Sequence, residues 1–250
     1  HDNVKALLVY KENPVLSLPP AKGELYPDII VGPGLRSEKV RRYLSTLDTV
    51  FDHRALSSAI FYSQLLSAGK MSHSQYLLPV SFNLPAVIFS SENKELVEDN
   101  YLISLDQIRQ TAAAYNKKNP NGMYSRIGFA PQNSAPFMYL VAKTKGARFR
   151  EYRNSFTWNK EQLANALAYI KTWTDSANTS SKTEQDFAFK YLYMSPYKQV
   201  TSGRCLFSYT TSNELFRMTT EQLSHIDFRW IREDKKIPLE DSVVMLGVAR

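Results

Sequence analysis

Four short turns at the expected ends of strands hold the side chains that could carry out chemistry. They supply hydroxyl groups, carboxamides and aromatic rings, and no charged groups. In order they are Gly32-Pro33-Gly34, Ser81-Phe82-Asn83, Gln132-Asn133-Ser134 and Tyr209-Thr210-Thr211-Ser212-Asn213. Hydroxyls and amides hydrogen-bond to ligand hydroxyls, and aromatic rings stack on the apolar faces of sugar rings. This composition suits a neutral, polyhydroxylated ligand.

Ten residues of these turns are the candidate binding residues: Gly34, Ser81, Phe82, Asn83, Asn133, Ser134, Tyr209, Thr210, Ser212 and Asn213. Among them, Ser81 and Asn83 would donate and accept hydrogen bonds, and Phe82 and Tyr209 would offer stacking surfaces. Taken singly, such residues are more often helix caps, a role open to Ser134 and to Thr211 or Ser212. Their recurrence at four strand ends favours binding, because α/β sheets bind ligands at the carboxyl ends of their strands.

The sequence gives little support for nucleotide binding, metal binding or nucleophilic catalysis. The chain has no GxGxxG, Walker A, HExxH or GxSxG motif, and its four histidines lack metal-ligand spacing: His1, His53, His73 and His225. Neither a cofactor nor a metal is therefore expected. Cys205 is the only cysteine, and its place in an apolar strand predicts a buried, inert thiol. A glycosidase stays open as an alternative, because paired carboxylates need only meet in space.

The charge balance raises a second alternative, a basic nucleic-acid-binding protein. The 250 residues include 31 Lys and Arg against 24 Asp and Glu, a formal net charge of +7. The cations are dispersed in short clusters: residues 36–42, 143–150 and 235–236. Dispersed cations near helix ends favour a solvated surface over a nucleic-acid groove. No run of 18 apolar residues occurs, and a hydrophobic fraction of 43% is typical of a globular protein.

Strands alternate with helices along the chain, which predicts an α/β fold. The main expected strands cover residues 4–10, 27–31, 127–130, 204–209, 228–231 and 243–248. Three helices have clear starting signals. Ser104 with Gln107 forms a capping box, Ser134 caps a helix with Pro136 in its first turn, and Asn159 opens the third.

Four segments resemble a known family: Pro27–Pro33 (PDIIVGP), Tyr76–Phe89 (YLLPVSFNLPAVIF), Val200–Tyr209 (VTSGRCLFSY) and Ile237–Val248 (IPLEDSVVMLGV). They resemble a cleft-loop strand, a first crossover, a strand before a ligand loop, and a second crossover. The family is the extracellular solute-binding proteins of bacterial ABC importers, in the carbohydrate-binding, maltodextrin-binding-like group. Two departures stand out. Arg204 replaces the usual Lys, and residues 89–93 replace the usual Tyr-Asn-Lys.

The resemblance implies a two-lobed periplasmic-binding-protein-like fold with a ligand cleft between the lobes. Residues 1–83 plus 229–250 would form the N-terminal lobe and residues 84–228 the C-terminal lobe, with a helical C-terminal segment apparently missing. The implied function is capture of a sugar or similar solute by hinge closure and its delivery to a membrane permease, without catalysis. The resemblance further implies a monomer that binds no nucleic acid. Its expected location is the periplasm, or a lipid anchor at the outer face of a bacterial membrane, although no leader is present in the chain.

Overall fold

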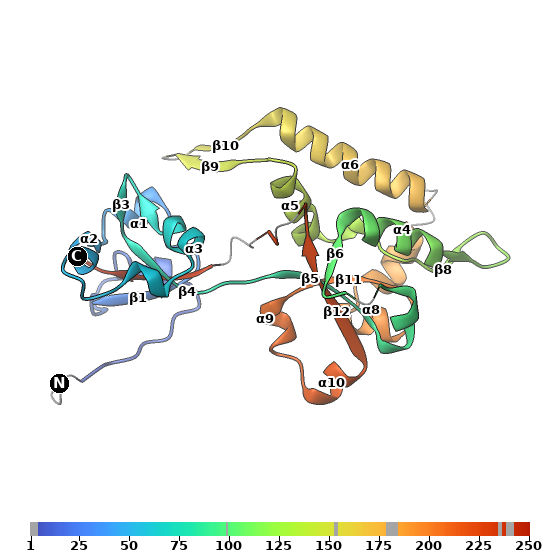
Figure 1. Cartoon of the computed structure of the whole chain (residues 1–250), viewed down its shortest axis with the longest axis horizontal. Helices are drawn as coiled ribbons and strands as arrows, with labels where there is room; N and C mark the ends of the chain where they lie inside the picture. The colour runs from blue at the N-terminus through green and yellow to red at the C-terminus, as the bar shows by residue number, and fades with distance from the viewer. Residues whose placement is uncertain (1–4, 99, 153–154, 179–184, 235–236, 239–242) are drawn as a thin grey trace. The chain divides into compact units, whose positions relative to one another are not determined.

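The computed structural model describes residues 5–98, 100–152, 155–178, 185–234, 237–238 and 243–250. These residues divide into two compact units (Figure 1). Unit 1 contains the described residues of 1–82, 151–155 and 241–250. Unit 2 contains those of 83–150 and 156–240.

The division differs from the expected one at the second crossover. The described residues of 229–240 group with unit 2 instead of unit 1, and those of 151–155 group with unit 1. The physical reason lies in strand β12 (Ile226–Arg232), which pairs antiparallel with β5 (Pro85–Ser90) and parallel with β6 (Leu102–Ser104). A boundary at residue 229 would cut through this strand.

Unit 1 is built on an antiparallel sheet of three strands in the order β1-β13-β4. Its strands are β1 (Ile29–Gly32), β2 (Lys70–Met71), β3 (Ser74–Gln75), β4 (Leu77–Ser81) and β13 (Val244–Val248). Its helices are η1 (Pro14–Ser17), α1 (Glu38–Arg41), α2 (Asp48–Asp52), η2 (Ser58–Ile60) and α3 (Ser63–Ala68). One face of the sheet packs on a core that includes Ile30, Leu44 and Met245.

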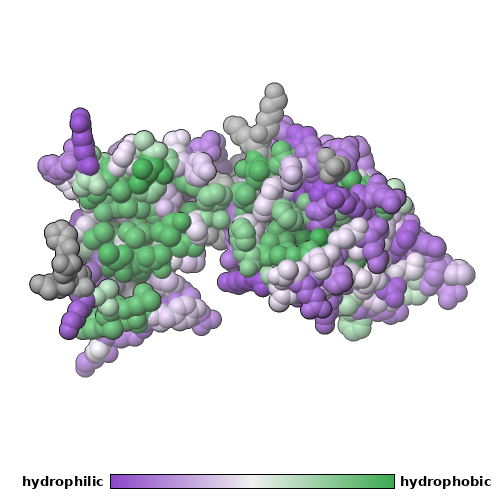
Figure 2. All heavy atoms as spheres, turned by 60° about the horizontal axis from the view of Figure 1, so that its bottom comes forward, coloured by the Kyte–Doolittle hydropathy of each residue, from purple (hydrophilic) through white to green (hydrophobic). Residues whose placement is uncertain are grey.

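The opposite face of this sheet carries apolar side chains that stay accessible. Ile29 and Val31 of β1 and Val80 of β4 are all exposed. Hydrophobic surface spreads over unit 1 in Figure 2, at the left. Strands with long apolar runs are typical of sheets covered on both faces, and in the described residues this one is covered on one face only.

The strand expected over residues 4–10 is wrong. Residues 5–10 have no regular structure, and Leu7, Leu8, Val9 and Tyr10 are all exposed; residue 4 lies outside the described part of the chain. An apolar run favours a strand only where a neighbouring strand accepts its backbone hydrogen bonds. None of the paired strands in the described residues includes this segment.

Unit 2 is built on a four-stranded sheet in the order β11-β5-β12-β6. Besides β5, β6 and β12, its strands are β7 (Lys117–Lys118), β8 (Tyr124–Arg126) and β11 (Ser208–Thr211). Strands β9 (Phe149–Tyr152) and β10 (Ser155–Trp158) each have residues in both units. Its longer helices are α4 (Leu105–Tyr115), α5 (Ala135–Thr144) and α6 (Lys160–Asn178). The shorter ones are η3 (Ser91–Leu96), η4 (Pro131–Asn133), the π-helix η5 (Ala188–Leu192), α8 (Pro196–Thr201), α9 (Ser212–Leu215) and α10 (Thr220–Ser224).

Strand β5 lies at the centre of unit 2 and all six of its residues are buried. Val87 and Phe89 belong to the large core that also takes in α4, α5 and α6. Ala86 and Ile88 belong to a second cluster, with residues of α8 and α9. Side chains alternate across a strand, so helices pack on both faces of this sheet (Figure 1).

The three helix starts that the sequence predicts are confirmed. Ser104 and Gln107 form a capping box at α4, and the Ser134 hydroxyl accepts a hydrogen bond from the Phe137 N–H at the start of α5. Asn159 directly precedes α6. Among the described residues, none of the helices combines the length and apolar character that crossing a membrane requires.

Candidate functional site

Unit 2 contains a cavity of about 320 Å³ between η4, the start of α5, α8 and β11. Its walls combine apolar side chains with hydroxyls, amides and one carboxylate. They include the predicted residues Asn133, Ser134 and Tyr209. The size lies at the lower end of the range typical of small-molecule sites.

Asn133 and Ser134 reach the cavity because η4 turns the chain sharply into α5. Asn133 ends η4 and is exposed, and Ser134 follows as the N-cap of α5. The Ser134 hydroxyl is 3.3 Å from the Phe137 amide that it caps. Capping uses one lone pair, so this hydroxyl keeps its proton to donate and a second lone pair to accept.

Strand β11 separates two neighbouring candidates onto opposite faces. Tyr209 and Thr211 line the cavity, and so does Ser208 on the same face as Thr210, whereas Thr210 itself is fully buried. The Thr210 hydroxyl donates to the Glu214 carboxylate at 2.9 Å, and Glu214 lines the cavity. Thr210 is therefore placed to orient a carboxylate at the cavity and does not itself line it.

The Tyr209 ring is mostly covered. It is 7% exposed and meets the Phe137 ring edge-on, with the ring centroids 5.8 Å apart. Only its cavity side remains for a ligand, which limits the stacking that the sequence predicts for this residue.

Gln199 and Glu214 are cavity residues that sequence reasoning missed. The Gln199 amide donates to the Leu192 and Met194 carbonyls, at 3.1 and 2.8 Å, and its oxygen accepts from the Ser208 hydroxyl at 3.0 Å. Gln199 thereby ties α8 and the chain before it to β11. No motif marks these two residues, but both follow a strand or helix start within five residues.

Asn83, Ser212 and Asn213 come together as a hydrogen-bonded cluster in unit 2. The Asn83 side-chain oxygen accepts from the Ser212 hydroxyl at 3.0 Å and from the Asn213 backbone N–H at 2.8 Å. The Ser212 hydroxyl also accepts from the Leu84 N–H at 3.0 Å. The sequence allows either Thr211 or Ser212 to cap α9, but neither side chain does so. The Ser212 hydroxyl instead bonds to Asn83 and Leu84, which directly precede β5. None of the three lines the cavity.

The remaining candidates lie in unit 1. Gly34 follows β1 with a φ of +74°, a left-handed conformation that favours glycine. Ser81 ends β4 and is exposed. The Phe82 ring is 38% exposed and meets the Tyr62 ring edge-on at 6.2 Å.

Cys205 is buried, as the sequence predicts. Desolvation raises the pKa of its thiol from 9.0 to about 12, so the thiolate does not form near neutral pH. In the described part of the chain no three His, Cys, Asp or Glu side chains group as metal ligands would.

The fold resembles those of solved sugar-binding proteins. CpMnBP1 with mannobiose matches with a TM-score of 0.61 and 15% identity, over 94% of this chain and 60% of that one. The ABC substrate-binding protein Lmo0181 from Listeria monocytogenes, in complex with cycloalternan, matches with a TM-score of 0.58 and 14% identity, over 90% of this chain and 57% of that one. This chain has the two-lobed fold of solute-binding proteins.

A third solute-binding protein supports the same assignment of fold. The galacto-N-biose/lacto-N-biose I-binding protein of the ABC transporter from Bifidobacterium longum matches with a TM-score of 0.57 and 13% identity, over 90% of this chain and 56% of that one. The chain thus spans 56–60% of the length of these three solute-binding proteins. No protein-family profile and no curated protein matches the sequence.

Proposed function

We propose that this protein is the solute-binding component of an ABC importer and that its ligand is a carbohydrate. The observation that carries the proposal is the unit 2 cavity, where hydroxyl and amide groups of Asn133, Ser134 and Thr211 stand beside the Tyr209 ring. These groups match the hydroxyls and apolar faces of a sugar. The fold, which this chain shares with sugar-binding proteins, supports the same reading.

The mechanism that we propose is a population shift. A ligand that touches both units would stabilise the arrangement in which it reaches both, and no bond needs to form or break. Phe82, Ser81 and Gly34 would supply the unit 1 contacts. Delivery would be to a membrane permease, from a monomer in the periplasm or anchored by lipid at the outer face of a bacterial membrane.

The glycosidase alternative asks for two carboxylates flanking one bond. Glu214 is the one carboxylate among the described residues that line the cavity, which favours binding over hydrolysis. Its two oxygens can accept hydrogen bonds from two sugar hydroxyls.

The test is calorimetric titration of the chain with mannobiose, maltotetraose and lacto-N-biose. Saturable binding is expected for at least one sugar, with no release of monosaccharide. Asn133→Ala should weaken it about tenfold, the loss of one hydrogen bond of about 1.4 kcal/mol. Asn121→Ala removes an exposed amide from the β7–β8 turn and should leave affinity unchanged.

Three results would count against the proposal. If none of the sugars gives saturable binding, the proposal of a carbohydrate ligand fails. Turnover of a chromogenic glycoside would favour the enzyme. Binding to nucleic acid that weakens steeply with salt, without any sugar binding, would favour the basic nucleic-acid-binding protein.

A further inference from the structure

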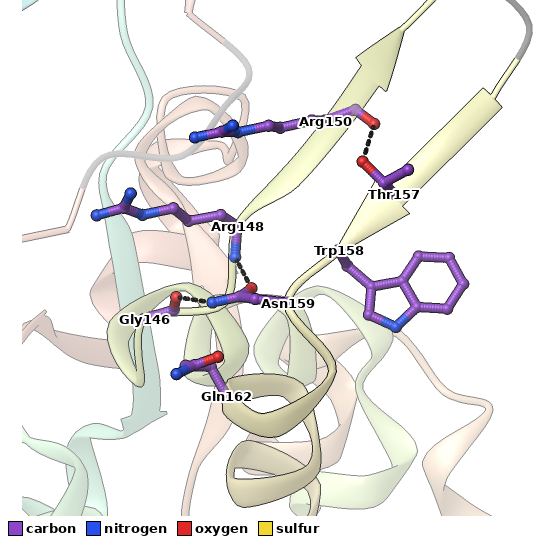
Figure 3. Close-up of a pocket in the computed structure, with 7 residues that line it drawn as sticks. All are labelled: Gly146, Arg148, Arg150, Thr157, Trp158, Asn159 and Gln162. Atoms are coloured by element: carbon purple, nitrogen blue, oxygen red, sulfur yellow. Dashed lines mark hydrogen bonds between the residues drawn. The ribbon is translucent and has the colours of Figure 1, made fainter.

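A second cavity of unit 2, of about 590 Å³, lies where the β9–β10 hairpin meets the start of α6 (Figure 3). It shares no residue with the first cavity. Its lining is polar apart from one indole and one glycine: Gly146, Arg148, Arg150, Thr157, Trp158, Asn159 and Gln162.

Two arginines dominate this cavity. Arg148 directly precedes β9 and Arg150 lies in it, so their side chains leave the extended chain on the same face. Figure 3 shows both guanidinium groups extending to one side of the hairpin, with the Trp158 ring on the other side. Phe149, between them, takes the opposite face and stacks on the Phe156 ring at 6.0 Å and 11°. The aromatic stack thus holds the arginine face outward.

The backbone beneath the arginines is held by hydrogen bonds. The Asn159 side-chain oxygen accepts from the Arg148 N–H at 2.6 Å, and its nitrogen donates to the Gly146 carbonyl at 2.9 Å. The Thr157 hydroxyl donates to the Arg150 carbonyl at 3.4 Å. The two guanidinium groups therefore extend from a fixed stretch of chain.

Neither arginine has an acidic partner among the described residues. Other cations of unit 2 have one: Lys145 is 3.4 Å from Glu233, and Arg109 is 3.2 Å from Asp106. Within the ranges that the structure describes, neither Arg148 nor Arg150 has a carboxylate within ion-pair distance. Two positive charges thus face the cavity without a counter-charge from the described residues.

We propose that this cavity binds an oxyanion: a carboxylate, sulfate or phosphate group. Guanidinium groups present paired N–H donors that match such groups, and the amides of Gln162 and Asn159 lie beside them. The group can be a free inorganic anion or the acidic substituent of a sugar. This site does not rest on the proposed function, because none of its residues belongs to the first cavity.

The test titrates the full chain with sodium sulfate, inorganic phosphate, glucuronate and glucose at constant ionic strength, followed by calorimetry. Saturable binding is expected for at least one anion and not for glucose. The double variant Arg148→Gln/Arg150→Gln should weaken it at least about tenfold, as loss of charge-assisted hydrogen bonds predicts. The matched control Arg36→Gln/Arg217→Gln removes two exposed arginines elsewhere and should leave affinity unchanged.

The outcomes separate the sources of the anion. Binding of sulfate or phosphate supports an inorganic ligand, and binding of glucuronate alone supports an acidic sugar. Equal weakening by both double variants, with thermal unfolding unchanged, would mean general charge attraction and overturn the site. Lack of saturation with all three anions would overturn it as well. Asn133→Ala changes the first cavity only and should not alter anion binding. The sugar-binding proposal can therefore fail while the anion site stands, and the reverse also holds.

Discussion

The side chain of Ser212 joins two parts of unit 2 that are far apart in the sequence. Its hydroxyl bonds to Asn83, 129 positions away, and accepts from the Leu84 N–H. Ser212→Ala leaves both groups without this partner. We expect the free energy of unfolding to fall by about 1–3 kcal/mol, because buried polar groups that lose their hydrogen bonds are costly. Urea unfolding measures this change in the free energy of unfolding.

The control for this variant is Ser67→Ala, which changes an exposed serine in α3. Its unfolding free energy should stay within about 0.5 kcal/mol of the parent protein. Equal effects of the two variants would contradict the bridging role of Ser212.

Because Cys205 is buried, we can predict the reactivity of its thiol and how the stability of the protein depends on pH. The native thiol should resist alkylation at pH 8, because its pKa is about 12, and should react fully in denaturant. Between pH 9.0 and about 12 the unfolded chain loses a proton that the folded protein keeps, so stability should fall over this window. Mass spectrometry after brief iodoacetamide treatment measures the reactivity, and rapid native labelling would refute the prediction.

At the scale of the elements, Gly128 sets how closely α4 approaches the chain leading to η4. A Cβ built on Gly128 would overlap the Ala112 carbonyl oxygen of α4. The Gly128 N–H also donates to the Asn116 side chain at 2.7 Å, and its carbonyl accepts from the Phe207 N–H at 2.8 Å. The cavity wall around Phe129 and Ala130 depends on this contact.

Gly128→Ala should therefore lower the free energy of unfolding by more than about 3 kcal/mol, because the added Cβ overpacks against a backbone that cannot move aside. Gly122→Ala is the comparison: its φ is +75° but no atom lies within 4 Å of the added Cβ. Gly122→Ala should lower the free energy of unfolding by only about 1–2 kcal/mol, because alanine disfavours the left-handed backbone. Thermal unfolding ranks the two, and a larger loss for Gly122→Ala would contradict the packing argument.

At the scale of the whole molecule, ligand binding should raise stability. A sugar present at 100 times its dissociation constant should add about 2.7 kcal/mol to the free energy of unfolding, because it binds only the folded state. The midpoint of thermal unfolding should rise with the sugar that the calorimetric panel identifies. A non-binding sugar of the same size serves as the control, and an unchanged midpoint at saturation would argue against a folded-state site.

The sequence by itself determined the features that depend on neighbours within a few positions. The capping box of α4, the Ser134 cap and the helix start at Asn159 follow from local hydrogen bonding and side-chain periodicity, and the structure has all three. The fold class, argued from strand and helix alternation and from family resemblance, is confirmed by the solved solute-binding proteins.

Only the tertiary structure decided which of the candidate residues meet. Residues 5–10 are apolar enough for a strand but pair with none of the described strands. Packing around β11 buries Thr210 completely and leaves Tyr209 lining the cavity, and a contact across 129 positions makes Ser212 a bridge instead of a cap. Gln199 and Glu214 join the site because α8 and α9 pack beside β11. These outcomes depend on long-range packing, which local spacing does not encode.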